Sequence, residues 1–109
     1  MLTQKKILEQ LIKTKPEIES LGIRVLGLFG SYAQGAATEL SDIDILIETT
    51  PQFVQQTDPL YAFSVLQEVR DKYQLMFQTT VDIADKNALS DIGKEHILGT
   101  VIYVSRIQV

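Results

Sequence analysis

The chain has 109 residues, which is enough for one domain, and we expect residues 1–109 to form it. Apolar residues make up 45% of the sequence and charged residues 22%, proportions typical of a soluble globular domain and not of a disordered chain. The absence of cysteine excludes disulfide scaffolds, thiolate zinc sites and cysteine nucleophiles, and it fits a cytoplasmic protein. A net charge of −4 argues against non-specific binding to nucleic acid, but it does not exclude a nucleotide held through a cation.

No segment of the sequence resembles a membrane span or a leader. The longest nearly unbroken apolar stretch, Val25 to Gly30, is far shorter than the ~20 residues that a membrane span needs. Met1 is followed by Leu-Thr-Gln-Lys-Lys without a long apolar run, so we expect no signal peptide.

The N-terminal segment predicts two helices. Thr3 is a suitable N-cap for the first of them. An apolar stripe follows at helical spacing, formed by Ile7, Leu8, Leu11 and Ile12. Pro16 is expected to break this helix and to occupy the first turn of a short second one, which Gly22 would close.

Two apolar runs then predict strands. Ile23 to Phe29 has the character of a buried strand, and Ile43 to Glu48 of another. Between them, Gly30 to Ser41 is small and polar and predicts a turn or short helix followed by a loop. Thr49 to Thr57 is expected to be a polar connection.

The C-terminal half predicts a long helix, a strand, a short helix and a last strand. Asp58 and Pro59 are a typical cap and first-turn pair for a helix that runs to about Tyr73. We expect its apolar side to consist of Leu60, Phe63, Leu66, Val69 and Tyr73. The later elements are expected over Thr80 to Ala84, Asp91 to Leu98 (ending at Gly99) and Val101 to Val104. The mixture indicates an α/β or α+β fold, with a small mixed sheet and helices packed on one face.

The stretch from Gly30 to Asp44 carries the most chemical information. Gly30 and Ser31 directly follow a predicted buried strand, where a glycine lets backbone N–H groups approach a ligand. Consecutive N–H groups at such a turn can bind phosphate, and Ser31 adds a hydroxyl. The alternative is an ordinary strand-to-helix turn with Ser31 as the N-cap.

Three aspartates are predicted to share the open face of the sheet. Asp42 and Asp44 stand two residues apart at the start of a strand, so both carboxylates point away from the isoleucines that face the core. Asp82 has the same parity between Val81 and Ile83, whereas Asp85 has the opposite parity and is expected to be a cap or surface residue. Like charges this close repel unless a cation lies between them, and oxygen ligands suit Mg²⁺. The alternative is a solvated strand end.

These residues resemble the minimal nucleotidyltransferases of the DNA polymerase β superfamily. The motif of that family is Gly-Ser, ten residues, then Asp-x-Asp. Here residues 32–41 separate Gly30-Ser31 from Asp42-Ile43-Asp44, and Asp82 matches the later acidic residue. One departure is Gln34, which stands where many relatives have arginine and removes a cation near the phosphates.

The resemblance implies a polymerase-β-like core and Mg²⁺-dependent nucleotidyl transfer, with ATP as the donor. Asp42, Asp44 and Asp82 would then be the catalytic and metal-binding residues for two Mg²⁺ ions, while Gly30 and Ser31 would bind the donor phosphates. It also implies a partner, a HEPN ribonuclease toxin, which the chain would neutralise as an antitoxin by transferring AMP to a tyrosine. The alternatives are a degenerate antitoxin that only binds its partner, and a small-molecule nucleotidyltransferase of the antibiotic-modifying type.

Overall fold

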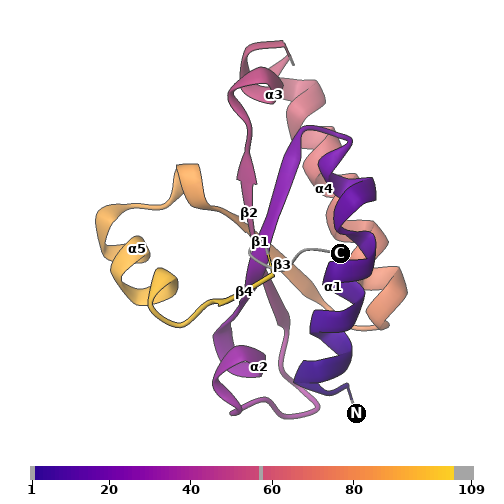
Figure 1. Cartoon of the computed structure of the whole chain (residues 1–109), viewed down its shortest axis with the longest axis vertical. Helices are drawn as coiled ribbons and strands as arrows, with labels where there is room; N and C mark the ends of the chain where they lie inside the picture. The colour runs from indigo at the N-terminus through magenta and orange to yellow at the C-terminus, as the bar shows by residue number, and fades with distance from the viewer. Residues whose placement is uncertain (1, 57, 105–109) are drawn as a thin grey trace.

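The computed structural model describes residues 2–56 and 58–104, which form a four-stranded sheet with helices around it (Figure 1). The strands are β1 (Ile23–Phe29), β2 (Ile43–Thr49), β3 (Val81–Asp85) and β4 (Ile102–Tyr103). The helices are α1 (Gln4–Glu19), α2 (Gly30–Gln34), α3 (Pro51–Gln56), α4 (Pro59–Phe77), the 3₁₀ turn η1 (Lys86–Ala88) and α5 (Asp91–Leu98). The predicted mixed sheet is therefore confirmed.

The strand order is β3-β2-β1-β4, and the sheet is mixed. β1 is antiparallel to both β2 and β4, whereas β2 is parallel to β3 because α4 carries the chain back across the sheet. The register of β1 with β2 shifts between Val25 and Gly27. A Cβ at Gly27 would collide with the backbone of Ile102, so this glycine allows β4 to approach β1 closely.

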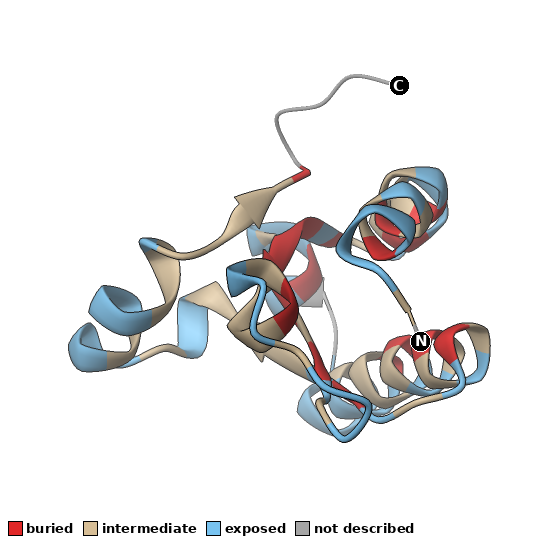
Figure 2. Ribbon diagram, turned by 90° about the horizontal axis from the view of Figure 1, so that it is seen from below, coloured by how far each residue is buried: buried red, intermediate tan, exposed pale blue. Residues whose placement is uncertain are grey.

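Helices α1 and α4 cover one face of the sheet, and the core lies between them and the strands (Figure 2). Ile43, Ile45 and Ile47 are fully buried on that face, which confirms the predicted alternation along β2. α1 and α4 are joined in the core by a hydrogen bond of 3.2 Å between the hydroxyls of Thr14 and Tyr73. α5 lies on the other side, away from α1 and α4 (Figure 1).

Helix α1 runs through Pro16, so the prediction of a break at this residue is wrong. Thr3 caps the helix by accepting a hydrogen bond from the Lys6 N–H, as expected. The helix then continues to Glu19, and its buried face includes Ile18, two residues beyond the proline. Burial of this side chain favours continuation of the helix and offsets the hydrogen bond that proline cannot donate. Gly22 adopts φ +91° in the turn before β1 and closes no second helix.

The expected polar connection after β2 contains a short helix, α3. β2 itself extends to Thr49, one residue beyond the prediction. Pro51 opens α3, and the Thr50 hydroxyl accepts a hydrogen bond of 3.2 Å from the Phe53 N–H. Phe53 is buried in the core, which holds the helix against the domain. Thr57 lies outside the described residues.

Helix α4 begins as predicted but is longer, and its buried face agrees only in part with the predicted one. Asp58 caps it by accepting hydrogen bonds from the N–H groups of Leu60 and Tyr61. Its buried residues recur every four positions: Val65, Val69, Tyr73 and Phe77. Leu60 and Phe63 were expected in this set, but they are 82% and 63% exposed. The helix continues past Tyr73 to Phe77, whose ring is buried and stacks on the ring of Tyr73 with the centroids 6.0 Å apart.

The last elements agree with the predictions to within two residues. β3 begins and ends one residue later than expected, α5 has the predicted bounds, and β4 is the shorter segment Ile102–Tyr103. Ser90 caps α5 through a hydrogen bond from the Gly93 N–H. Among the described residues, no helix is both long and apolar enough to cross a membrane.

Candidate active site

The parallel pairing of β2 and β3 places two of the predicted aspartates opposite each other. Asp44 and Asp82 are direct partners in the register of these strands. Neighbouring Cα atoms in a sheet lie about 5 Å apart, so the two carboxylates leave the same face side by side. Asp42 stands just before β2, is exposed, and has the same parity as Asp44. The three carboxylates that the sequence singles out therefore gather at one end of the open face.

Asp44 lies at the centre of this group, and its charge is poorly compensated. Partial burial, and then the charges of Asp82 and Asp42, raise the pKa of Asp44 from 3.8 to about 6. Each of these causes disfavours the ionised form. A bound cation would relieve all of them, and this makes Asp44 the strongest candidate for a metal ligand in the group.

Gly30 leaves the space that the Asp44 carboxylate occupies. It follows β1 directly, and β1 places Phe29 opposite Asp44 in the antiparallel register. Gly30 adopts φ +74°, and a Cβ there would collide with the Asp44 carboxylate. Both the backbone conformation and the close approach thus require glycine at this position.

The first N–H groups of α2 are not occupied by a side-chain cap. The N-cap is Phe29, whose side chain makes no capping hydrogen bond, so the alternative with Ser31 as the N-cap is not what the structure shows. The Ser31 hydroxyl forms no hydrogen bond with residues 2–56 or 58–104. N–H groups at the start of a helix and a free hydroxyl can both donate to an anion.

A hydrogen-bonded turn, which the sequence-based predictions do not include, directly precedes Asp42. The Thr38 N–H donates a hydrogen bond of 2.8 Å to the Ser41 hydroxyl, and the Thr38 hydroxyl accepts one of 3.2 Å from the Leu40 N–H. The Ser41 N–H in turn donates to the Thr38 carbonyl. Ser/Thr turns of this kind have a recognisable local signal, a threonine and a serine three residues apart.

Asp85 has the structural role that its parity predicts. Its carboxylate accepts hydrogen bonds from the Thr49 N–H at 3.4 Å, the Thr49 hydroxyl at 3.0 Å and the Asn87 N–H at 3.0 Å. It thereby caps η1 and ties the end of β3 to the end of β2. Asp85 is engaged in the fold, whereas Asp82 points into solvent beside Asp44.

The carboxylates fit a magnesium ion that also takes ligands from a nucleotide. In the described part of the chain, no group of three or more His, Cys, Asp or Glu side chains is placed to hold a metal ion by itself. Mg²⁺ is usually bound through one or two carboxylates, with water and substrate phosphates completing its shell. The pair Asp44 and Asp82 beside the free N–H groups of α2 matches this mode.

Comparison with known proteins decides which family this arrangement represents. The family "Polymerase beta, Nucleotidyltransferase" matches residues 5–107. The chain belongs to this nucleotidyltransferase family.

Its relatives include the protein adenylyltransferase MntA of Thermococcus cleftensis, which is 33% identical over 105 residues, covering 95% of this chain and 98% of that protein. Two solved structures have the same fold, each at 24% sequence identity. One is a toxin-antitoxin crystal structure with AMP-PNP, with a TM-score of 0.63 over 94% of this chain and 72% of that chain. The other is assigned as a minimal nucleotidyltransferase, with a TM-score of 0.61 over 87% of this chain and 93% of that chain.

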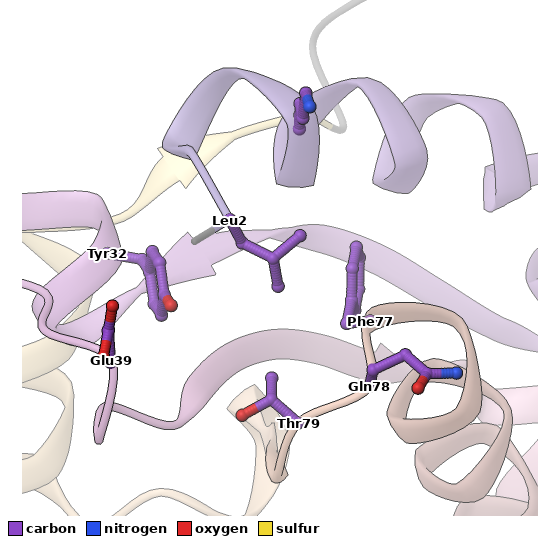
Figure 3. Close-up of a pocket in the computed structure, with 7 residues that line it drawn as sticks. Leu2, Tyr32, Glu39, Phe77, Gln78 and Thr79 are labelled. Atoms are coloured by element: carbon purple, nitrogen blue, oxygen red, sulfur yellow. The ribbon is translucent and has the colours of Figure 1, made fainter.

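This nucleotidyltransferase also has a cavity of about 440 Å³ between the start of α1 and the end of α4 (Figure 3). Leu2, Tyr32 and Phe77 form its apolar wall, and Glu39 and Thr79 contribute polar atoms. None of Asp42, Asp44 and Asp82 lines it. The cavity is therefore separate from the cluster of three aspartates. Among the residues that line it, Tyr32 of α2 is the nearest in sequence to the Gly30-Ser31 motif.

Proposed function

We propose that this chain transfers AMP from ATP, in a Mg²⁺-dependent reaction, to a tyrosine of a HEPN ribonuclease toxin and so acts as its antitoxin. The observation that carries the proposal is the pairing of Asp44 with Asp82 directly beside Gly30. A relative named as a protein adenylyltransferase and a structural neighbour described as a toxin-antitoxin with AMP-PNP support the donor and the class of acceptor.

Each predicted site residue has a task in this reaction. The N–H groups of Gly30 and Ser31 and the Ser31 hydroxyl would donate to the donor phosphates. Asp42, Asp44 and Asp82 would hold Mg²⁺, with two ions expected. When bound, Mg²⁺ supplies positive charge that offsets the charge of the triphosphate and of the attacking oxygen.

The chemistry is an in-line displacement at the α-phosphorus of ATP. The tyrosine oxygen forms a bond to this phosphorus, the bond to the β-phosphate oxygen breaks, and pyrophosphate leaves. Asp82 would accept the proton of the attacking hydroxyl, since its carboxylate is exposed and close to Asp44. The product is a tyrosine with AMP attached through a phosphodiester.

The shape of the site favours a macromolecular acceptor. The carboxylates lie on the open face of the sheet, and Asp42 and Asp82 are exposed. Asp82 lines a groove of about 260 Å³ between β3 and α4, and neither Asp42 nor Asp44 lines that groove. A protein surface can cover such an open site and exclude water from it.

Intact-mass spectrometry of the toxin after incubation with this chain, ATP and MgCl₂ tests the proposal. We expect AMP-sized mass additions to the toxin with the wild-type chain and none with Asp42→Asn. The control Asp71→Asn, at an exposed aspartate of α4, should modify the toxin as the wild-type chain does. Neutralisation of the toxin without modification would overturn the transfer and favour a degenerate, binding-only antitoxin, in line with Gln34. No complex with the toxin, together with adenylylation of a small molecule, would favour the antibiotic-type enzyme.

A further inference from the structure

Strand β3 is an edge strand of the sheet, next to α4. The backbone N–H and C=O groups of its successive residues point alternately toward β2 and toward the outer edge. The Ile43 N–H of β2 donates to the Thr80 carbonyl, so residues 80, 82 and 84 turn their N–H and C=O groups toward β2. Residues 81, 83 and 85 therefore turn theirs toward the outer edge. An outer edge of this kind is able to pair with another extended chain.

Side chains of α4 form hydrogen bonds with the backbone of Val81, the first outward-facing residue of β3. They form none with the backbone of Ile83, the next outward-facing residue. The Val81 N–H donates to the Gln74 side-chain carbonyl at 3.2 Å, and the Val81 carbonyl accepts from Arg70 Nε at 3.1 Å. The outward groups of Ile83 have no hydrogen-bond partner within residues 2–56 and 58–104. The open edge thus begins at Ile83.

A groove of about 260 Å³ runs beside this open edge, between β3 and the N-terminal half of α4. We call it the β3 groove, and its walls include Phe63, Leu66, Arg70, Asp82 and Ile83. Phe63 is 63% exposed, whereas Tyr73 and Phe77, nearer the C-terminal end of the same helix, are buried. An exposed apolar wall beside unpaired backbone groups is typical of a surface that binds an extended segment.

The β3 groove is continuous with the candidate active site through Asp82, which lines the groove and stands opposite Asp44. The groove also has a charge. Asp82 and Asp85 contribute carboxylates, whereas Arg70, the one cation among the described residues of its wall, already donates from Nε to the Val81 carbonyl. An occupant with basic residues would therefore complement it.

We propose that the β3 groove binds an extended, basic segment of the acceptor protein, which pairs with Ile83 and packs an apolar side chain against Phe63 and Leu66. This inference rests on the proposed function, because the segment would carry the hydroxyl that reaches Asp82. Backbone pairing at Ile83 sets the direction of the segment, and the apolar contact sets its position along the edge. The groove is thus the acceptor site of the enzyme.

The test compares two serine substitutions on the same helix, with the HEPN toxin as the acceptor. Phe63→Ser removes the apolar wall of the groove, and Leu75→Ser removes a side chain that is 76% exposed and does not line it. We expect Phe63→Ser to weaken toxin binding and kcat/KM for transfer about tenfold. ATP affinity and thermal stability should stay unchanged in both variants, and Leu75→Ser should behave as wild type.

Hydrogen exchange of the complex provides a second measurement. The Ile83 amide should exchange more slowly when the toxin is bound, and the affinity should fall as salt concentration rises. Equal losses in Phe63→Ser and Leu75→Ser, or an Ile83 amide without protection, would overturn the groove while leaving the transfer reaction intact. If the wild-type chain binds the toxin without modifying it, and Phe63→Ser abolishes this binding, the result would support the groove and overturn the proposed reaction. Absence of binding by the wild-type chain would overturn both.

Discussion

Asp44 is the aspartate of the candidate site whose pKa the fold raises. Its pKa of about 6 lies above the value of 3.8 expected in the unfolded chain. Between these pH values the unfolded chain has lost this proton and the folded chain has kept it. The contribution of Asp44 therefore makes the metal-free protein less stable as pH rises from about 4 to about 6, and constant above that range.

We predict that Asp44→Asn flattens this part of the stability profile and makes the metal-free protein more stable at pH 7. Part of the group is solvated, so a gain of about 1 kcal/mol is expected, well below the value for full burial. Urea unfolding at pH 4 and pH 7 without Mg²⁺ measures the effect, and Asp71→Asn is the control. An unchanged dependence on pH in Asp44→Asn would contradict the assignment of the raised pKa to this carboxyl.

Gly30 and Gly35 provide a matched pair that separates backbone strain from crowding of the site. Both have positive φ, +74° and +73°, but a Cβ at Gly35 would meet nothing within 4 Å, whereas one at Gly30 would collide with Asp44. We predict that Gly35→Ala costs about 1 kcal/mol of stability and leaves transfer intact. Gly30→Ala should cost about 2 kcal/mol or more and abolish nucleotide binding. Thermal melts and ATP titrations would show this difference, and normal ATP affinity in Gly30→Ala would count against the phosphate-binding role.

At the scale of an element, β3 carries two aspartates, Asp82 and Asp85, to which we assign different roles. We predict that Asp82→Ala strongly lowers transfer with little change in stability, because its carboxylate faces solvent beside Asp44. Asp85→Ala should leave transfer per folded molecule unchanged but cost about 1–2 kcal/mol, since it removes the acceptor of three hydrogen bonds. Activity assays and denaturant unfolding measure the two effects, and the reverse pattern would mean that the roles are exchanged.

The helices show where local signals are sufficient and where they are not. Caps at Thr3, Asp58 and Ser90 are short-range, and all three helices begin as their sequences indicate. The continuation of α1 past Pro16 and of α4 past Tyr73 depends on burial against other elements. Burial supplies most of the stability of a helix in a protein. Local signals such as an internal proline therefore do not by themselves show where a helix ends.

At the scale of the whole molecule, a long stretch of the chain that contains most of the candidate site carries no basic residue. From Val25 to Val69 the sequence contains no Lys, Arg or His. This range includes Gly30, Ser31 and the first two aspartates, so in the proposed reaction these segments would offer the donor phosphates N–H groups and a bound Mg²⁺ but no cationic side chain of their own. Gln34 is exposed at the end of α2, directly after the Gly30-Ser31 motif and Tyr32.

We predict that Gln34→Arg tightens ATP binding about fivefold, equivalent to roughly 1 kcal/mol, because a cation would be added near the phosphates. Gln52→Arg is the control, since it adds the same charge at an exposed position of α3. Isothermal titration with ATP and Mg²⁺ measures both. An unchanged affinity in Gln34→Arg would contradict the inference that a missing cation at this position limits phosphate binding.

The sequence alone determined the features that depend on local geometry. The alternation of side chains along a strand places Asp42 and Asp44 on one face and the isoleucines on the other, whatever the strand pairs with. The tertiary structure decided that Asp82 stands opposite Asp44, that Gly30 makes room for that carboxylate, and that α4 buries Val65 in place of Phe63. These are choices of strand register and helix rotation, and they follow from the free energy of packing whole faces together, which no short segment of the chain contains.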